Sequence, residues 1–198
     1  MRHDLSATGS AFGLRPITLA DARFVVELRT GSGRSEFLHS IAADIPRQEA
    51  YLARYFDRPG DYYFVIYRLA TGQPEGTVGL YDVDRDAGTA QWGRWIVQEG
   101  SLAALESAVL LYELAFDRLQ LRMVYCCTVA ANTPVVSFHR SFGLTTHGLL
   151  PRHFRIGDRV YDAVEQRLTR EQWSEIRAGV RATAARLAER MARLQGSE

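Results

Sequence analysis

The sequence predicts one α/β (α+β) domain, and three observations support this. Apolar, strand-like runs between residues 62 and 97 are joined by short turns, which is typical of an antiparallel meander. Residues 90–144 then read as strand, turn, helix, strand and helix. With 198 residues, 46% of them hydrophobic, the chain is long enough to bury the core of a single domain.

The N-terminal part predicts one strand and two helices. Residues 1–11 carry Ser, Thr and Gly and predict a flexible start. Phe12–Thr18 predicts a strand, and Thr18-Leu19-Ala20-Asp21 has the capping-box form that begins a helix. This helix is expected to end near Gly31, and Pro46 opens a second one.

The meander is expected to contain three strands. These strands are predicted at residues 62–69, 76–83 and 89–97, and the turns between them contain Gly, Pro and Asp. Because the connections are of hairpin length, neighbouring strands should run antiparallel.

The meander leads directly into a helix. The last strand ends at Val97, and apolar residues then recur at helical spacing as far as Leu119. Backbone N–H groups at such a helix N-terminus suit a phosphate. Met123–Val129 predicts a buried strand, and Asn132-Thr133-Pro134 begins another helix.

The C-terminal part predicts two strands, at 145–156 and 159–168, and a long amphipathic helix at 170–194. Three roles for this helix stay open. It packs on the domain or on a second subunit of a homodimer, it offers a basic surface to an anionic partner, or it belongs to a partly disordered tail. The expected organisation is a flexible N-terminus (1–11), a domain (12–169) and a helical extension (170–198).

Charge and cysteine content exclude several classes of protein. The 24 Lys and Arg residues are balanced by 23 Asp and Glu residues, so bulk electrostatics gives no reason to expect nucleic acid as a partner. Cys126 and Cys127 are adjacent in a predicted buried strand, which excludes a disulfide framework and a Cys-based zinc site; no metal is expected. Since neither a membrane-spanning run nor a signal peptide is recognisable, no membrane partner is expected, and the expected location is the cytoplasm.

One segment carries a family pattern. Asn132 is followed seven residues later by His139, and four residues beyond that by Gly143-Leu144. This resembles the GNAT superfamily of acyl-CoA-dependent N-acyltransferases, whose pattern has Asn, an aromatic residue and Gly-Phe at these positions. Three further segments are similar to the superfamily: 114–121, 157–162 and 171–173. The resemblance covers about residues 12–173. It implies a central mixed, mostly antiparallel sheet of about seven strands with helices on both faces, a C-terminal helix, and acetyl-CoA as cosubstrate.

Within this superfamily, the sequence most resembles the sugar-nucleotide N-acetyltransferases of the pseudaminic acid pathway. The similar segments are Glu27-Leu28-Arg29, residues 61–66, residues 79–84 and residues 90–95. The resemblance implies acetylation of the 4-amine of UDP-4-amino-4,6-dideoxy-N-acetyl-altrosamine, a nucleotide-linked amino sugar. Two alternatives stay open: a GNAT enzyme acting on a protein N-terminus, a polyamine or an aminoglycoside, and a non-catalytic CoA-binding protein.

The resemblance implies that acetyl-CoA binds where the third meander strand meets the next helix. Relatives usually have a Gly-rich loop there, whereas this chain keeps Gly100 but has Leu102 and Ala104 where glycines are common. A phosphate needs the N–H groups and the helix dipole rather than the glycines themselves, although glycines allow closer approach. The expected acetyl-CoA-binding residues are Ile96, Val97, Gly100, Ser101, Leu102, Ala103, Ala104, Asn132 and Arg140.

The implied reaction is direct attack of an amine on a thioester. It requires a deprotonated amine, a backbone N–H that polarises the carbonyl, and a proton for the departing sulfur. The resemblance implies that His139, which replaces the usual Tyr, is the catalytic general acid, and a His titrates near neutrality. The alternative is a His that packs on an amphipathic helix. Gln91 stands where many relatives have a Glu that acts as the general base, and Gln cannot take a proton. Glu49, Asp82 and His39 therefore stay open as candidates for a base.

Arg29, Tyr81, Arg94 and Trp95 are expected to bind the acceptor substrate. Arg binds phosphate bidentately, and aromatic rings stack on a base or a sugar. In a regular strand, Trp95 would lie on the face opposite Trp92 and Arg94, and Trp92 is expected to pack in the core.

Overall fold

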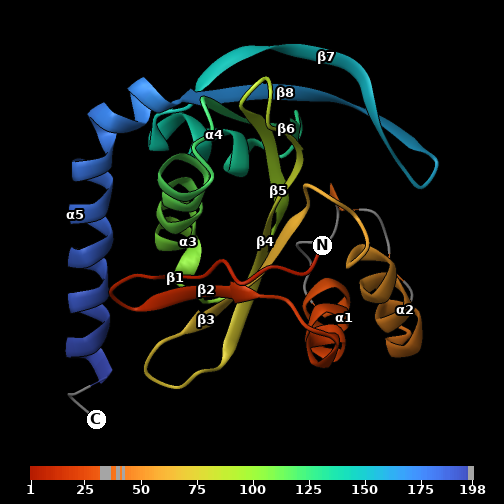
Figure 1. Ribbon diagram of the computed structural model, residues 1–198, viewed down its shortest axis with the longest axis horizontal. Helices are drawn as coiled ribbons and strands as arrows, with labels where there is room; N and C mark the ends of the chain where they lie inside the picture. The colour runs from red at the N-terminus through yellow and green to blue at the C-terminus, as the bar shows by residue number, and fades with distance from the viewer. Residues whose placement is uncertain (32–36, 39–40, 42, 196–198) are drawn as a thin grey trace.

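The computed structural model describes residues 1–31, 37, 38, 41 and 43–195, which form one mixed sheet of eight strands (Figure 1). The strands are β1 (Ala7–Thr8), β2 (Phe12–Pro16), β3 (Tyr62–Arg68), β4 (Pro74–Asp84), β5 (Thr89–Val97), β6 (Met123–Val129), β7 (Thr145–Ile156) and β8 (Arg159–Thr169). They lie in the order β1-β2-β3-β4-β5-β6-β8-β7. Only β5 and β6 are parallel neighbours, so the mostly antiparallel sheet predicted from the sequence is confirmed.

Within the same described residues, five α-helices cover the two faces of this sheet. They are α1 (Ala22–Thr30), α2 (Ile45–Tyr55), α3 (Ala103–Glu113), α4 (Thr133–Phe142) and α5 (Arg170–Gln195). Figure 1 shows α1 and α2 on one face and α3 and α4 on the other, with α5 outside α3. A smaller core of Leu52, Tyr55 and Tyr63 lies under α1 and α2, and the larger core around Trp92 lies under α3.

The sheet splits between β5 and β6. Thr89–Gln91 pair with Met123–Tyr125, and beyond these residues the ladder between the two strands ends. In the adjoining β4–β5 ladder, Arg94 and Trp95 together lie opposite a single residue of β4, and Arg94 has a φ of +50°. This bulge reverses the alternation of side chains. The rings of Trp92 and Trp95 therefore share a face, with centroids 5.4 Å apart. The prediction of opposite faces was wrong, because the strand is irregular at Arg94.

The N-terminal residues are packed, in contrast to the flexible start expected for residues 1–11. Ala7–Thr8 pairs with β2 and supplies the eighth strand. The backbone N–H groups of Ala11 and Phe12 donate to the carboxylate of Glu106 on α3, at 3.0 and 2.9 Å. The sequence pattern missed this because the stabilising acceptor is far away in the chain.

The C-terminal helix α5 packs on its own domain. Trp173 is 1% exposed, and its ring is parallel to that of Phe142 at 6.4 Å. Arg181 forms an ion pair with Glu113 on α3, and Met191 is buried further along the helix. The first of the three predicted roles, packing on the domain, thus accounts for the helix.

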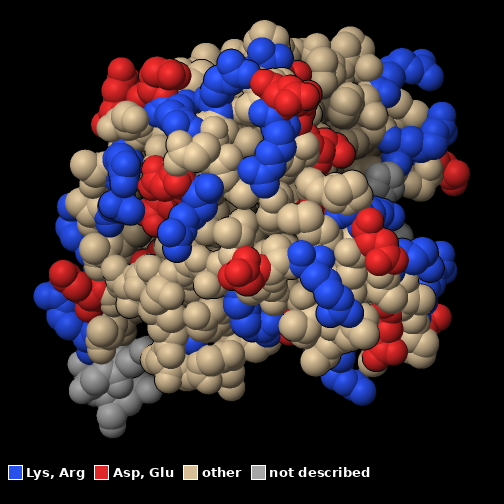
Figure 2. All heavy atoms as spheres, viewed as in Figure 1, with Lys and Arg blue, Asp and Glu red and all other residues tan. Residues whose placement is uncertain are grey.

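On the face shown in Figure 2, arginines and carboxylates are interspersed, as the nearly balanced charge of the sequence suggests. Among the described residues, no helix has both the length and the apolar character needed to cross a bilayer.

Candidate functional site

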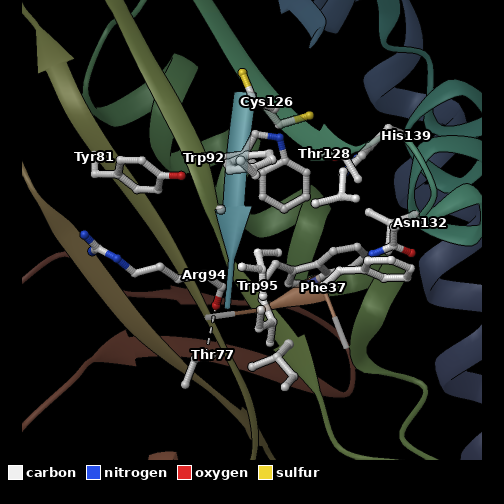
Figure 3. A pocket seen from close by; sticks show the side chains of 18 of the residues that line it. Phe37, Thr77, Tyr81, Trp92, Arg94, Trp95, Cys126, Thr128, Asn132 and His139 are labelled. Carbon is white, nitrogen blue, oxygen red and sulfur yellow. Dashed lines mark hydrogen bonds between the residues drawn. The ribbon is translucent and has the colours of Figure 1, made fainter. Parts of the chain in front are cut away.

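A cavity of about 320 Å³ lies where β5 and β6 diverge. Its wall includes Gly93 and Trp95 of β5 and Cys126 and Thr128 of β6, together with His139 of α4. Figure 3 shows Trp95 and His139 on one side of this cavity. The cavity exists because the two strands separate, which leaves the facing edges of β5 and β6 without a common ladder.

The cavity brings together half of the residues predicted to bind or react. Those lining it are Arg29, Tyr81, Arg94, Trp95, Ile96, Asn132 and His139. The remaining predicted residues do not line it: Val97, Gly100, Ser101, Leu102, Ala103, Ala104 and Arg140. Of these, residues 97–104 continue along the chain from Ile96 into the first turn of α3, and Arg140 is exposed on α4.

His139 packs among aromatic rings. It is 3% exposed, and its ring lies 4.8 Å from that of Trp92 and 5.8 Å from that of Trp95. Its Nδ1 atom is buried and has no hydrogen-bond partner within the described residues. Burial penalises the charged imidazolium and lowers the pKa of His139 to about 4. The expectation that His139 titrates near neutrality is therefore wrong, and the imidazole is neutral at pH 7.

Arg94 faces the other side of the sheet. Its guanidinium forms a bidentate ion pair with the buried carboxylate of Asp61, at 2.5 and 2.8 Å, and lies over the rings of Tyr63 and Tyr81. Figure 3 shows the guanidinium of Arg94 pointing away from Trp95 and His139, whereas the Tyr81 hydroxyl points toward Trp92. The predicted grouping of Arg94 with Trp92 was wrong for the same reason as above, the bulge in β5. The Asp61 carboxylate already balances the charge of Arg94.

Gly93 gives Tyr81 its place at the cavity. A Cβ atom added to Gly93 would lie 2.5 Å from the Tyr81 hydroxyl oxygen and 3.3 Å from two ring carbons. Burial raises the pKa of Tyr81, so its hydroxyl stays protonated at neutral pH. The glycine is therefore required for close approach of the Tyr81 side chain to the β5 backbone.

Asn132 precedes α4 and lines the cavity. Its backbone carbonyl accepts from the Val136 N–H at 3.1 Å, as a helix N-cap does. Its side chain makes no capping hydrogen bond. The capping alternative for this side chain is therefore not observed, and the binding role implied by the resemblance stays a prediction.

The N-terminus of α3 keeps backbone donors despite its single glycine. The Ser101 hydroxyl accepts from the Ala103 N–H at 3.2 Å and donates to the carboxylate of Glu75. The N–H groups of Ala104 and Leu105 lie in the first turn, where helix geometry provides no carbonyl partner. The helix terminus therefore retains the features that suit a phosphate.

The candidates for a general base that the structure describes, Glu49 and Asp82, do not line the cavity. Gln91 lies in the paired part of β5, and Glu49 and Asp82 are exposed. His39 lies outside the described residues. Among the described residues that form the cavity wall there is no Asp or Glu.

Sequence reasoning missed several wall residues. Cys126, Cys127 and Thr128 follow the point where β6 leaves β5, and Phe154 and Ile156 come from β7. Burial raises the pKa of Cys126 to about 12, so this thiol remains protonated. No local pattern identifies these residues, because only the divergence of two strands exposes them. No cluster of three or more potential metal ligands occurs in the part of the chain that the structure describes.

Comparisons with known proteins agree with this architecture. A family model described as an acetyltransferase (GNAT) domain matches residues 12–145. The structure of apo FdhC, described as a nucleotide-linked sugar GNAT, is similar with a TM-score of 0.75 and 25% identity, over 89% of this chain and 97% of that chain. No curated protein sequence matches this chain significantly.

Two further solved structures share the fold. A GCN5-related N-acetyltransferase from Brucella melitensis gives a TM-score of 0.81 at 20% identity, over 91% of this chain and 86% of that one. A mutant spermidine N-acetyltransferase, SpeG from Vibrio cholerae, gives a TM-score of 0.73 at 18% identity, over 83% of this chain and 97% of that chain. Because the family model matches well over half of the sequence, the chain belongs to the GNAT acetyltransferase family.

Proposed function

We propose that the protein transfers an acetyl group from acetyl-CoA to the amine of a nucleotide-linked amino sugar. The acceptor that the sequence favours is UDP-4-amino-4,6-dideoxy-N-acetyl-altrosamine, in pseudaminic acid biosynthesis. The observation that carries the proposal is a cavity with walls from both sides of the split sheet, so that a donor and an acceptor can meet there. The similarity to a structure described as a nucleotide-linked sugar GNAT supports the acceptor class.

The donor would bind on the side of α3 and α4. The pantetheine arm fits the edge of β5 beyond Gln91, where the ladder to β6 has ended. Asn132 would hydrogen-bond this arm, and the N–H groups at the start of α3 would bind the pyrophosphate. Ile96 and Val97 connect these two parts of the donor site.

The reaction would begin with attack of the neutral amine on the thioester carbonyl. A β5 backbone N–H that has no partner in β6 would polarise the carbonyl oxygen. The C–N bond forms and the C–S bond breaks; the nitrogen loses one proton and the sulfur gains one. Neutral His139 would stabilise the departing sulfur by donating an N–H hydrogen bond to it as the C–S bond breaks, and the proton lost by the nitrogen would end on the sulfur.

The acceptor amine would enter in its neutral form, because no carboxylate of the described cavity wall can take its proton. A polyamine is disfavoured by the same observation, since a polycation needs acidic partners and the described wall contains Arg29 but no Asp or Glu. The free thiols of Cys126 and Cys127 support action in a reducing compartment, and we propose the cytoplasm.

Thermal unfolding tests this proposal. Acetyl-CoA at a hundredfold excess over its Kd should raise Tm by about 5–10 °C, because it binds only the folded state. UDP-linked amino sugars should add a further shift, whereas spermidine and peptides should not. A shift with spermidine but not with the amino sugars would contradict the proposed acceptor class, and no shift with acetyl-CoA would contradict the donor site and the transferase activity.

A further inference from the structure

A second cavity, of about 310 Å³, lies between α1 and α2. Three arginines line it: Arg29 from the end of α1, and Arg47 and Arg54 from α2. Arg29 lines the cavity at the β5–β6 split as well. The two cavities therefore adjoin at this side chain, on the face of the sheet where the acceptor is expected.

The helical spacing of α2 builds this cavity. Arg47, Tyr51 and Arg54 are separated by four and three residues, which places them on one face of the helix. Gln48 lies beside them and is only 8% exposed, and its amide supplies donors and an acceptor. The sequence pattern of α2 alone did not single out these residues, because each Arg is a common surface residue.

The charge in this cavity is strongly positive. Arg47 and Arg54 are exposed, and neither forms an ion pair within the described part of the chain. The carboxylate that lines the cavity belongs to Asp44, which accepts the Arg47 backbone N–H at 3.0 Å as the N-cap of α2. Arg94, in contrast, is already paired with Asp61.

We propose that this arginine cavity binds the anionic part of the acceptor, which is a diphosphate if the acceptor is a nucleotide-linked sugar. The inference rests on the proposed function and adds the position of the acceptor's phosphates. Arg47 and Arg54 take the phosphate-binding role first expected of Arg94. Guanidinium groups bind phosphate oxygens bidentately. With the diphosphate between α1 and α2, Arg29 marks the path by which the sugar amine reaches the first cavity.

Calorimetric titration of UDP into the protein saturated with acetyl-CoA tests this assignment. Arg47→Gln and Arg54→Gln should each raise the Kd for UDP about tenfold or more, because each removes charge-assisted hydrogen bonds. The control is Arg23→Gln, which removes an exposed charge on α1 and should leave the Kd unchanged. The affinity for inorganic pyrophosphate should fall as much as the affinity for UDP, whereas the affinity for uridine should not change in any of the three variants.

Two outcomes would overturn the inference in distinguishable ways. If the wild type binds UDP and acetylates the amino sugar, but Arg47→Gln and Arg54→Gln bind UDP normally, then the diphosphate lies elsewhere and the proposed function stands. If the wild type binds acetyl-CoA but not UDP, the acceptor class fails together with the arginine cavity. Unchanged binding of acetyl-CoA in every variant shows that each one is folded.

Discussion

At the scale of single residues, the site depends on Gly93 and His139, which act in different ways. Gly93 has no side chain because the Tyr81 hydroxyl occupies that space. His139 is neutral because the surrounding rings exclude water from it. The sequence pattern indicated His139 but not Gly93, and the packing that gives both residues their properties comes from β4 and β5.

Gly93→Ala should destabilise the protein by about 1–3 kcal/mol and lower activity, because the new methyl group overlaps the Tyr81 side chain. Chemical denaturation and steady-state rates measure the two effects. Adding Tyr81→Phe removes the nearest atom and should restore part of the stability. If Gly93→Ala were as stable and as active as the wild type, the close approach would not matter.

His139→Phe should lower kcat about 10²-fold, the usual scale for losing a group that assists proton transfer. It should also preserve or raise Tm, since Phe fits an aromatic cluster and removes a buried nitrogen without a partner. His139→Gln keeps an N–H donor and should retain more activity than the Phe variant. An unchanged kcat in His139→Phe would remove this residue from the mechanism.

At the scale of elements, most helices and strands were predictable because their periodicity is local. The capping box before α1, Pro46 at the start of α2 and the hairpin turns between β3, β4 and β5 are examples. The bulge at Arg94 was not predictable, because Trp92-Gly93-Arg94-Trp95 reads as an ordinary strand. Likewise, β1 is two residues long and depends on a carboxylate about a hundred residues away.

The hydrogen bonds from the start of the chain to the Glu106 carboxylate on α3 can be tested by substitution of Glu106. Glu106→Gln should lower the free energy of unfolding by about 1–3 kcal/mol, because a carboxamide cannot accept from Ser10, Ala11 and Phe12 as the carboxylate does. Urea denaturation measures this loss. Glu113→Gln, which disturbs only a surface ion pair at the other end of α3, should have little effect. Equal effects of the two substitutions would contradict this role of Glu106.

At the scale of the whole molecule, the split sheet separates the side on which we propose that acetyl-CoA binds from the side proposed for the acceptor. The sequence resemblance predicted the GNAT fold and the helices on both faces, and the family match confirms it. Which side chains meet in the cavity was only partly predictable, because strands β4, β5 and β6 contribute to one wall from distant parts of the sequence. The arginines of α2 could be recognised only once α1 lay beside them.

Acid should destabilise the whole molecule through His139. Its pKa is about 4 in the folded state and about 6.5 when unfolded, so between these values the unfolded state binds more protons. Stability is therefore retained above pH 6.5 and falls as the pH drops toward 4, by roughly 3 kcal/mol from this residue. Urea denaturation at a series of pH values should show this fall in the wild type and a smaller one in His139→Phe. If stability fell equally with pH in the wild type and in His139→Phe, a depressed pKa of His139 would be contradicted.

Transfer of a radiolabelled acetyl group from acetyl-CoA to UDP-4-amino-4,6-dideoxy-N-acetyl-altrosamine tests the central claim most directly. The chain contains no lysine, so acetylation of its own lysine side chains cannot contribute to the signal. We predict that the label appears in the sugar nucleotide and not in spermidine or peptide offered at the same concentration. We also predict that His139→Phe strongly lowers the rate of labelling. Label in spermidine or peptide but not in the sugar nucleotide would contradict the account.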